Sequence, residues 1–508
     1  MNERVILIGL DGAEPSMVEA MLPRCPNLAR LAGEGAWGTM ASTLPPLSPP
    51  AWATLMTGVN PGKHGVYDFY HMPQRAQQSY VRRLITSAVW RAPGLWDYAT
   101  AAGRRSGFVN MPMCWPPPAV DGFFVCGLGA PAGSDGFTHP PALAASLADA
   151  VLEPGDGTTM DDPAAFLERC ALSGASMLEV SERLWRAGDL DLFCTALTFP
   201  DRFQHLFWTN LVGRDGAVRA VWDAWFASFD AFLGRIMAAA HDAGSTVIVF
   251  SDHGFGPVER YFHVNRWLFQ RGYLTLRDPT RLGAADGLLT AIDWEHTRAY
   301  GLGEYGDIRL NLRGREPLGC VAPGTHARAL RIALTTELQQ LRDRGEPVVD
   351  EVLEGNVVYH GAHADEGADL LVRLRDRRVL CLIDGRGNDL RDPNGPLFVD
   401  ATGPQHYRGA HRDTGLLGAW GAGIRPDAPV PAAHAQDLCP TVLHLLGLPL
   451  DRGLDGRVLR ELLSDVHAAR DPEYVEGVSA ATADARAAYD AAEEAAIAEQ
   501  LRQLGYLE

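Results

Sequence analysis

The stretch Ser245–Gly256, STVIVFSDHGFG, decides how the rest of the chain is interpreted. Its first half is apolar and mostly β-branched, which predicts a buried strand over Thr246–Ser251. Asp252 and His253 then stand where the strand opens into a loop. A carboxylate beside an imidazole at the carboxyl end of a strand suits a divalent metal ion.

Other strand-like runs alternate with helix-like runs on both sides of this stretch. Strands are predicted at Arg4–Leu10, Arg104–Met111 and Asp191–Thr198, and helices at Pro15–Gly33, Ser173–Ala187 and Phe203–Ala243, the last broken near Gly213–Gly216. Such alternation predicts an α/β fold with a mainly parallel central sheet sandwiched by helices. Ligands of these sheets gather beyond the strands' carboxyl ends, where Asp11, Asp201 and Asp252 all fall.

Composition limits the classes of function. The 508 residues are 46% hydrophobic and 21% charged with a net charge of −18, so we expect a globular protein that does not bind nucleic-acid polymers. The eight cysteines form no CxxC pair, and several lie in apolar runs as small hydrophobic residues. The first residues lead directly into a strand without a signal-peptide pattern, and no run approaches a membrane span. We therefore expect a cytoplasmic protein that uses no membrane; its oligomeric state is left open.

The expected organisation has four parts. Residues 1–266 form the first part of a catalytic core, with long Pro- and Gly-rich rim loops near 70–162. Residues 267–365 form a smaller cap insertion with a helix near Thr325–Arg344. The core resumes over 366–465 with strands at Ala368–Arg375 and Arg378–Asp384, and 466–508 form a helical tail.

Seven residues form the candidate site: Asp11, Ser48, Asp201, His205, Asp252, His253 and His411. Asp201 and His205 are four residues apart, so at a helix start they share one face and can share a metal. Three Asp and three His without Cys suit two zinc ions or a similar metal pair.

Each residue also has an ordinary structural interpretation. The aspartates and His253 suit caps or turns, His205 suits an aromatic helix face, and Ser48 suits a helix N-cap because Pro49 can open a helix. A hydroxyl at a helix N-terminus beside a cation would also be an activated nucleophile. His411 competes with four unassigned histidines: His64, His263, His363 and His406.

Six motifs in order, LIGLDGAEP, PPLSPPAWATLMTGVNPGKHGVYDF, FPDRFQHLFW, FSDHGFGP, GAHRDTG and LRQLGYLE, cover most of the chain. With them the chain resembles the type I phosphodiesterase/nucleotide pyrophosphatase family of the alkaline phosphatase superfamily. The resemblance implies two divalent ions about 4 Å apart, zinc or alternatively manganese. It assigns one ion to Asp201, His205 and His411, and the other to Asp11, Asp252, His253 and the Ser48 hydroxyl.

The sequence departs from the nucleotide-cleaving members at three places. Phe69 stands where those members usually carry an Asn that contacts a phosphoryl oxygen, Ser48 where they usually have Thr, and Ala51 where they often have Asn. Asn110 and Lys63 are candidates to replace the missing donor as substrate-binding residues. Arg202 is interpreted as an ion-pair or rim residue, with a phosphate contact as the alternative.

The resemblance implies a hydrolase that cleaves a small phosphodiester or phosphoanhydride with Ser48 as nucleophile and a phosphoseryl intermediate. A phosphomonoesterase, phosphonate hydrolase or phosphomutase on the same two-metal site is the first alternative. A non-catalytic metal- or ligand-binding protein on a retired enzyme scaffold is the second.

Overall fold

The computed structural model describes residues 3–72, 80, 83–131, 135–153, 162–213, 216–278, 287–303, 305–382, 390, 394–402, 408–479 and 489–504. The chain divides into two compact units. The first comprises Met1–Asn60, Ile85–Gly256 and His411–Leu507, and the second is built mainly from Pro61–Leu84 and Pro257–Ala410. The last residues of the LRQLGYLE motif lie outside the described residues.

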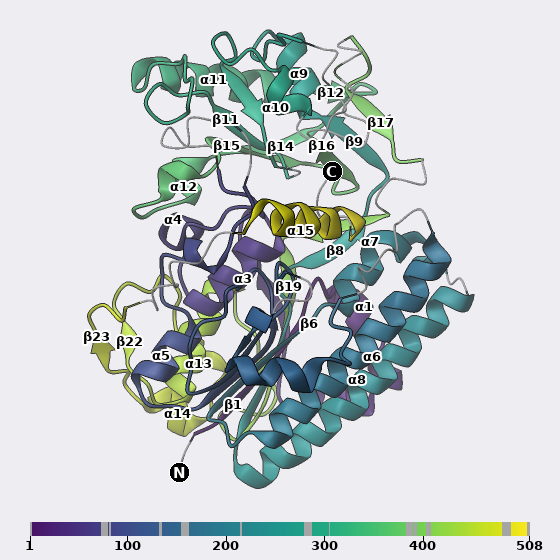
Figure 1. Cartoon of the computed structure of the whole chain (residues 1–508), viewed down its shortest axis with the longest axis vertical. Coiled ribbons are helices and arrows are strands. Elements are labelled where there is room, and N and C mark those ends of the chain that lie inside the picture. The colour runs from purple at the N-terminus through teal and green to yellow at the C-terminus, as the bar shows by residue number, and fades with distance from the viewer. Residues whose placement is uncertain are drawn as a thin grey trace. The chain divides into compact units, whose positions relative to one another are not determined.

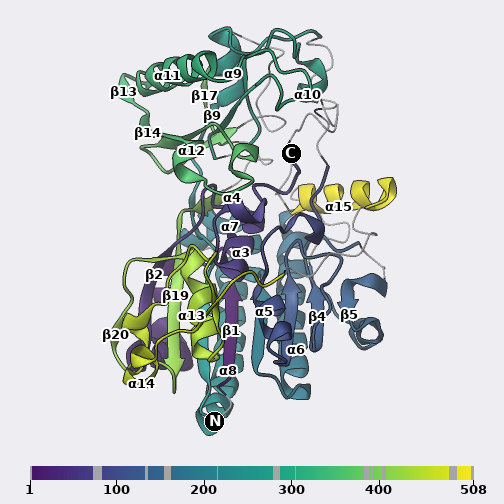
Figure 2. The same cartoon turned by 90° about the vertical axis from the view of Figure 1, so that its left-hand side faces the viewer.

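A ten-stranded sheet forms the centre of the first unit (Figures 1 and 2). Its order is β20 (Ala428–Pro429), β2 (Ala36–Ala41), β19 (Thr414–Gly421), β7 (Thr246–Phe250), β1 (Val5–Leu10), β6 (Leu192–Leu197), β3 (Ser106–Met111), β4 (Gly122–Cys126) and β5 (Thr138–His139), with β21 (Ala433–His434) also paired to β2. The central strands β7, β1, β6, β3 and β4 run parallel, while β19 runs antiparallel to both β7 and β2. The strands β1, β6 and β7 are buried along their whole lengths because helices cover both faces of the sheet. The predicted α/β architecture is confirmed.

Helices pack on both faces of this sheet (Figure 1). One face carries α2 (Pro26–Glu34), α6 (Pro163–Ala187) and α8 (Gly216–Ala243), and the other carries α3 (Ser48–Thr57), α5 (Leu95–Ala101) and α13 (Leu438–Leu445). The helix α7 (Phe199–Val212) follows β6 and has Gly213 as its C-cap, where the sequence predicts a break. The described part of the tail contains α15 (Ala491–Gln503), capped by the Asp490 carboxylate.

Three expectations need correction. The helix predicted at Ser173 begins at Pro163, where Asp162 caps the backbone N–H of Ala165. The helix predicted over Pro15–Gly33 is interrupted between α1 (Pro15–Glu19) and α2, because Pro23 and Pro26 cannot continue a helix. The segment 70–162 is more regular than a set of long loops, since it supplies α5, β3, β4 and β5.

The second unit contains smaller sheets. Four strands pair antiparallel in the order β10 (Ala299–Gly301), β11 (Asp307–Leu310), β15 (Leu370–Leu374) and β14 (Val349–Glu354), with α11 (Thr325–Gln339) packed on β14. Three further strands are β16 (Val379–Leu382), β9 (Arg260–His263) and β17 (Phe398–Asp400). The strands predicted near 368–375 and 378–384 therefore form as β15 and β16 but pair within these sheets, and the chain returns to the large sheet only at β19.

Among the described residues, no helix combines the length and apolarity that crossing a bilayer requires.

Gly9 in β1 offers a test of how tightly the sheet packs against α3. A methyl group at Gly9 would overlap the ring of Trp52, which is fully buried. We expect Gly9→Ala to lower the free energy of unfolding by about 1–3 kcal/mol through overpacking. The control is Gly33→Ala in α2, where the added carbon faces open space and a stabilisation of about 0.5 kcal/mol is expected. Urea unfolding measures both, and equal effects would contradict the packing argument.

Candidate metal centre

The carboxyl ends of β1, β6 and β7 bring the three candidate aspartates to one edge of the sheet. The parallel register pairs Leu10 with Leu197 and Gly9 with Phe250, so the loops that follow these strands emerge side by side. Asp11 directly follows β1, Asp201 lies in the first turn of α7 after β6, and Asp252 follows β7. All three are fully buried.

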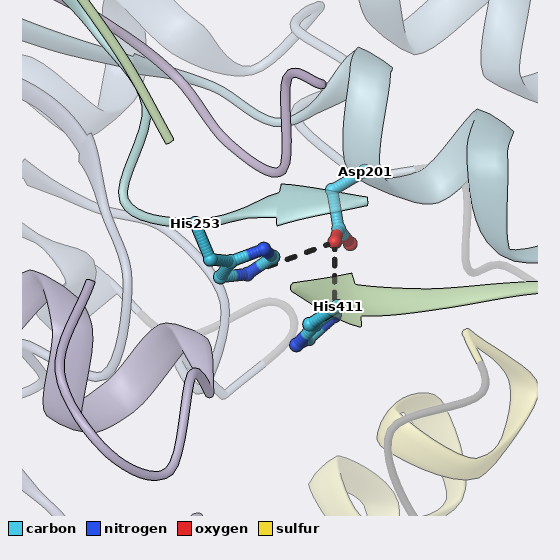
Figure 3. A group of neighbouring side chains, drawn as sticks. All are labelled: Asp201, His253 and His411. Carbon is cyan, nitrogen blue, oxygen red and sulfur yellow. Dashed lines mark ion pairs between the residues drawn. The ribbon is translucent and has the colours of Figure 1, made fainter. Parts of the chain in front are cut away.

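Asp201 is the centre of one group of donor atoms. Its Oδ1 lies 3.2 Å from Nε2 of His411 and 3.6 Å from Nε2 of His205, and these two nitrogens are 3.1 Å apart. The predicted pairing of Asp201 and His205 on one helix face is therefore present in the structure. Figure 3 shows Asp201 together with His411 and with His253, whose Nε2 lies 4.0 Å from Oδ1 of Asp201.

A second group forms around His253. Its Nε2 lies 3.2 Å from Oδ2 of Asp252 and 3.7 Å from Oδ1 of Asp11. Within the described ranges, the sets able to hold a metal are Asp201–His253–His411 and Asp11–Asp252–His253, each with ligand atoms within 4.8 Å of one another. The two sets share His253, so they are adjacent positions in one buried cluster.

Ser48 joins the second group. It is the first residue of α3, and Leu47 rather than Ser48 occupies the N-cap position. The N-cap interpretation of Ser48 is therefore wrong. The Ser48 hydroxyl instead lies 3.3 Å from Nε2 of His253 and 3.5 Å from Oδ1 of Asp11.

Backbone carbonyls set the orientation of two imidazoles. Nδ1 of His411 lies 2.9 Å from the carbonyl oxygen of Pro46, and Nδ1 of His253 lies 3.1 Å from that of Gly254. A carbonyl only accepts, so Nδ1 carries the proton in each ring and Nε2 keeps its lone pair for a ligand. This is the arrangement in which histidines bind metals, with the second nitrogen held by the protein.

The cluster concentrates more negative charge than its side chains balance. Burial, together with repulsion between the carboxylates, raises the pKa values of Asp11 and Asp252. Burial also opposes ionisation of Asp201, but His205, His411 and Arg202 outweigh it and lower its pKa. Burial and the neighbouring His411 lower the pKa of His253, which keeps that imidazole neutral. Oδ2 of Asp252 has no hydrogen-bond partner among the described residues. A divalent cation is the group that this donor set and charge fit.

Gly12 connects the three strand ends through its backbone. Its N–H donates to Oδ1 of Asp252 at 3.0 Å, and its carbonyl accepts from Nε2 of Gln204 at 2.7 Å. Its φ is +63°, and a Cβ there would meet the side chain of Asp201. Sequence reasoning missed Gln204, although its position three residues after Asp201 on the same helix was a usable signal.

Trp52 is a second residue whose role the sequence did not reveal. It is fully buried, and its Nε1 donates to Oδ2 of Asp11 at 3.0 Å. The i,i+4 spacing from Ser48 was the signal that could have placed both side chains on the face of α3 toward the site.

The remaining candidates have other surroundings. Arg202 is a buried ion-pair residue that donates to Asp201 and Glu153, as the first interpretation expected. Asn110 is fully buried and donates through Nδ2 to the carbonyl of Ala196 at 2.9 Å, so that donor already has a protein acceptor. Lys63, in α4 (Pro61–His64), and the buried Phe69 belong to the second unit. The substrate-binding roles of Asn110 and Lys63 stay predictions.

Comparisons with known proteins identify the family of the chain and its fold. The model of the type I phosphodiesterase/nucleotide pyrophosphatase family matches residues 5–380. No curated protein sequence matches the chain. Human ectonucleotide pyrophosphatase/phosphodiesterase 5 is similar in structure with a TM-score of 0.52 and 14% identity, over 91% of this chain and all of that one.

Two further solved structures carry small ligands. The inactive murine ectonucleotide pyrophosphatase/phosphodiesterase 5, in complex with AMP, has a TM-score of 0.52 and 16% identity over 91% of this chain and all of that one. Phosphonoacetate hydrolase from Sinorhizobium meliloti, in complex with phosphonoacetate, has a TM-score of 0.58 and 16% identity over 88% and 96% of the two chains. At these identities the similarity shows a shared fold.

Trp52→Phe tests whether the hydrogen bond to Asp11 holds the centre in place. We expect the affinity for divalent metal to fall about tenfold, because Asp11 loses the donor that orients it. Trp222→Phe is the matched control, since Trp222 is also fully buried and its Nε1 has no hydrogen-bond partner among the described residues. Both variants lose packing volume, but only Trp52→Phe also loses the hydrogen bond to Asp11. Metal affinities measured by calorimetric titration therefore separate the loss of the hydrogen bond from the loss of packing. Equal metal affinities in the two variants would contradict the role given to Trp52.

Proposed function

The chain belongs to the type I phosphodiesterase/nucleotide pyrophosphatase family, and on this premise we propose that it cleaves small phosphodiesters with Ser48 as the nucleophile at a centre for two divalent ions. The coarser activity, hydrolysis of phosphoester bonds, comes with the family. The nucleophile, the ions and the substrate class are the proposal. They rest on the residues that meet at the carboxyl end of the sheet.

The observation that carries the proposal is the position of the Ser48 hydroxyl. It lies within 3.5 Å of Oδ1 of Asp11 and 3.3 Å of Nε2 of His253, both of which belong to the buried donor cluster. Ser48 is the first residue of α3 rather than its N-cap, and its hydroxyl is directed at these two site residues.

The donor atoms suggest how two ions would be held. Asp201, His205 and His411 would hold one, and Asp11, Asp252, His253 and Ser48 would hold the other, with His253 near enough to Asp201 to border both positions. When bound, divalent ions lower the pKa of a hydroxyl or a water and stabilise charge on phosphoryl oxygens. Zinc suits the mixture of imidazole and carboxylate, and manganese is the alternative.

The chain's own groups then account for the steps of hydrolysis. The Ser48 oxygen attacks phosphorus while the bond from phosphorus to the leaving oxygen breaks, and the proton that Ser48 gives up to solvent is balanced by the proton that the departing group takes up from it. Water next attacks the phosphoseryl ester and releases Ser48. Trp52 holds Asp11, and the carbonyls of Pro46 and Gly254 hold His411 and His253. The site is thus organised before substrate arrives.

The charges near Asp201 favour a diester over a monoester. A monoester brings an additional negative charge that needs a cationic side chain. Arg202, the cation next to Asp201, is already bound by the carboxylates of Asp201 and Glu153. A small phosphorylated compound is therefore the proposed substrate, with a diester preferred. Phosphonate hydrolysis is the second candidate, since the bacterial structural neighbour is a phosphonoacetate hydrolase.

Ser48→Ala tests the nucleophile. We expect turnover to fall about a thousandfold or more while elemental analysis still finds close to two divalent ions, because three protein ligands remain at that position. Acid-quenched wild-type protein should contain a phosphorylated Ser48 peptide by mass spectrometry. Ser228→Ala is the control, as its hydroxyl only bonds to the carbonyl of Ala224 on an exposed helix face. Near wild-type turnover of Ser48→Ala would mean that water attacks directly.

Substrate class is tested with a matched pair of chromogenic esters. Bis(4-nitrophenyl) phosphate should have a kcat/KM about tenfold above that of 4-nitrophenyl phosphate, which is roughly 1.4 kcal/mol of transition-state binding. The reason is the neutralised Arg202. A monoester preferred by the same factor would replace the diesterase proposal with the phosphomonoesterase alternative.

A further inference from the structure

Arg202 is an unusual neighbour for a metal ligand, because it places a buried positive charge beside the carboxylate of Asp201. Its side chain is 2% exposed, and its Nη1 donates to Oδ2 of Asp201 at 2.9 Å. Oδ1 of the same carboxylate faces His205 and His411. Arg202 therefore fixes one oxygen of Asp201 and leaves the other directed at the metal centre.

Glu153 binds the other side of this guanidinium. Its carboxylate accepts from Nε of Arg202 at 3.0 Å and from Nη2 at 3.2 Å, in a bidentate fork. The Glu153 side chain is only 8% exposed although it lies outside the regular elements, ahead of α6. The three charges form a buried chain from Glu153 through Arg202 to Asp201, with one surplus negative charge.

We propose that Glu153 is a positioning residue which sets the charge that the Asp201 position presents to a divalent ion, acting through Arg202. This inference rests on the metal centre of the proposed function. Without Glu153, the Arg202 charge would neutralise Asp201 and repel a cation a few ångströms away. With Glu153, the Arg202 charge is already balanced, so Asp201 keeps its full attraction for the ion. Weak screening in a buried site makes this difference large.

The charge argument predicts an order of metal affinities among variants. A Glu153–Arg202 ion pair that only held the two segments together would not produce this order. Arg202→Met leaves two negative charges in the chain and should bind metal more tightly. The parent protein and the double variant Glu153→Gln/Arg202→Met each have one net negative charge in the chain, so they should bind the metal with equal affinity. Glu153→Gln leaves none and should bind at least about tenfold more weakly, the range found when groups that support metal ligands are lost.

The experiment titrates metal-free protein with Mn²⁺ alone by calorimetry and compares the melting temperatures with and without the ion. Glu182→Gln is the matched control, because Glu182 makes the same bidentate fork to Arg235, at 2.7 and 2.6 Å, between α6 and α8. We expect the control to lose some stability and to keep the parent's Mn²⁺ affinity. The double variant should restore the affinity that Glu153→Gln loses.

Two results would overturn the inference while leaving the proposed function intact: a Glu153→Gln protein that binds Mn²⁺ as the parent does, or a double variant as weak as Glu153→Gln. If Glu153→Gln does not fold, the double variant carries the test, since a structural tie predicts that it too binds weakly. A parent that binds no divalent ion overturns the metal centre and this inference with it.

Discussion

The constraint on which this structure depends is the repulsion among three carboxylates buried at one edge of a sheet. Asp11, Asp201 and Asp252 are each fully buried, and this burial, together with repulsion between the carboxylates, raises the pKa values of Asp11 and Asp252. A protein meets such a cost only when other groups hold the carboxylates and balance them. The backbone of Gly12, the indole of Trp52 and the guanidinium of Arg202 each hold one carboxylate. The imidazoles of His205, His253 and His411 lie beside these carboxylates. Much of the local architecture follows from this requirement.

The sequence predicted the parts of the fold whose pattern is local. Buried parallel strands such as VILIGL and TVIVF are apolar throughout, and their carboxyl ends bear the aspartates, so both the sheet and the meeting of these side chains could be inferred. Short strands such as β15 and β16 look the same whichever sheet they join, which is why their partners could not be inferred. The start of α6 was placed ten residues too late, although Phe166 and Cys170 are buried at helical spacing in the part that was missed.

Within the site, residue type and spacing revealed the donors but not the groups that orient them. Asp201 and His205 are recognisable because a helix fixes their relation. Glu153 precedes Arg202 by 49 residues, and no periodicity links a loop carboxylate to a helix that follows another strand. From sequence, the Ser48 hydroxyl suits both a helix N-cap and a nucleophile. The structure places Leu47 at the N-cap position, which leaves the nucleophile role for Ser48. Contacts between distant segments are a property of the folded chain, so they have no signature in a single sequence.

The two prolines after Ser48 have a consequence for how this fold can vary among related enzymes. A helix N-terminus ordinarily binds an anion through the free N–H groups of its first turn, but Pro49 and Pro50 have none. The first turn of α3 thus has fewer N–H groups to bind an anion. Side chains, and any cations that they bind, must do so instead. A variant that keeps these prolines and loses one of the carboxylates cannot replace it with an N–H group of Pro49 or Pro50. The two prolines therefore make an anion site at this helix start depend on the neighbouring acidic side chains.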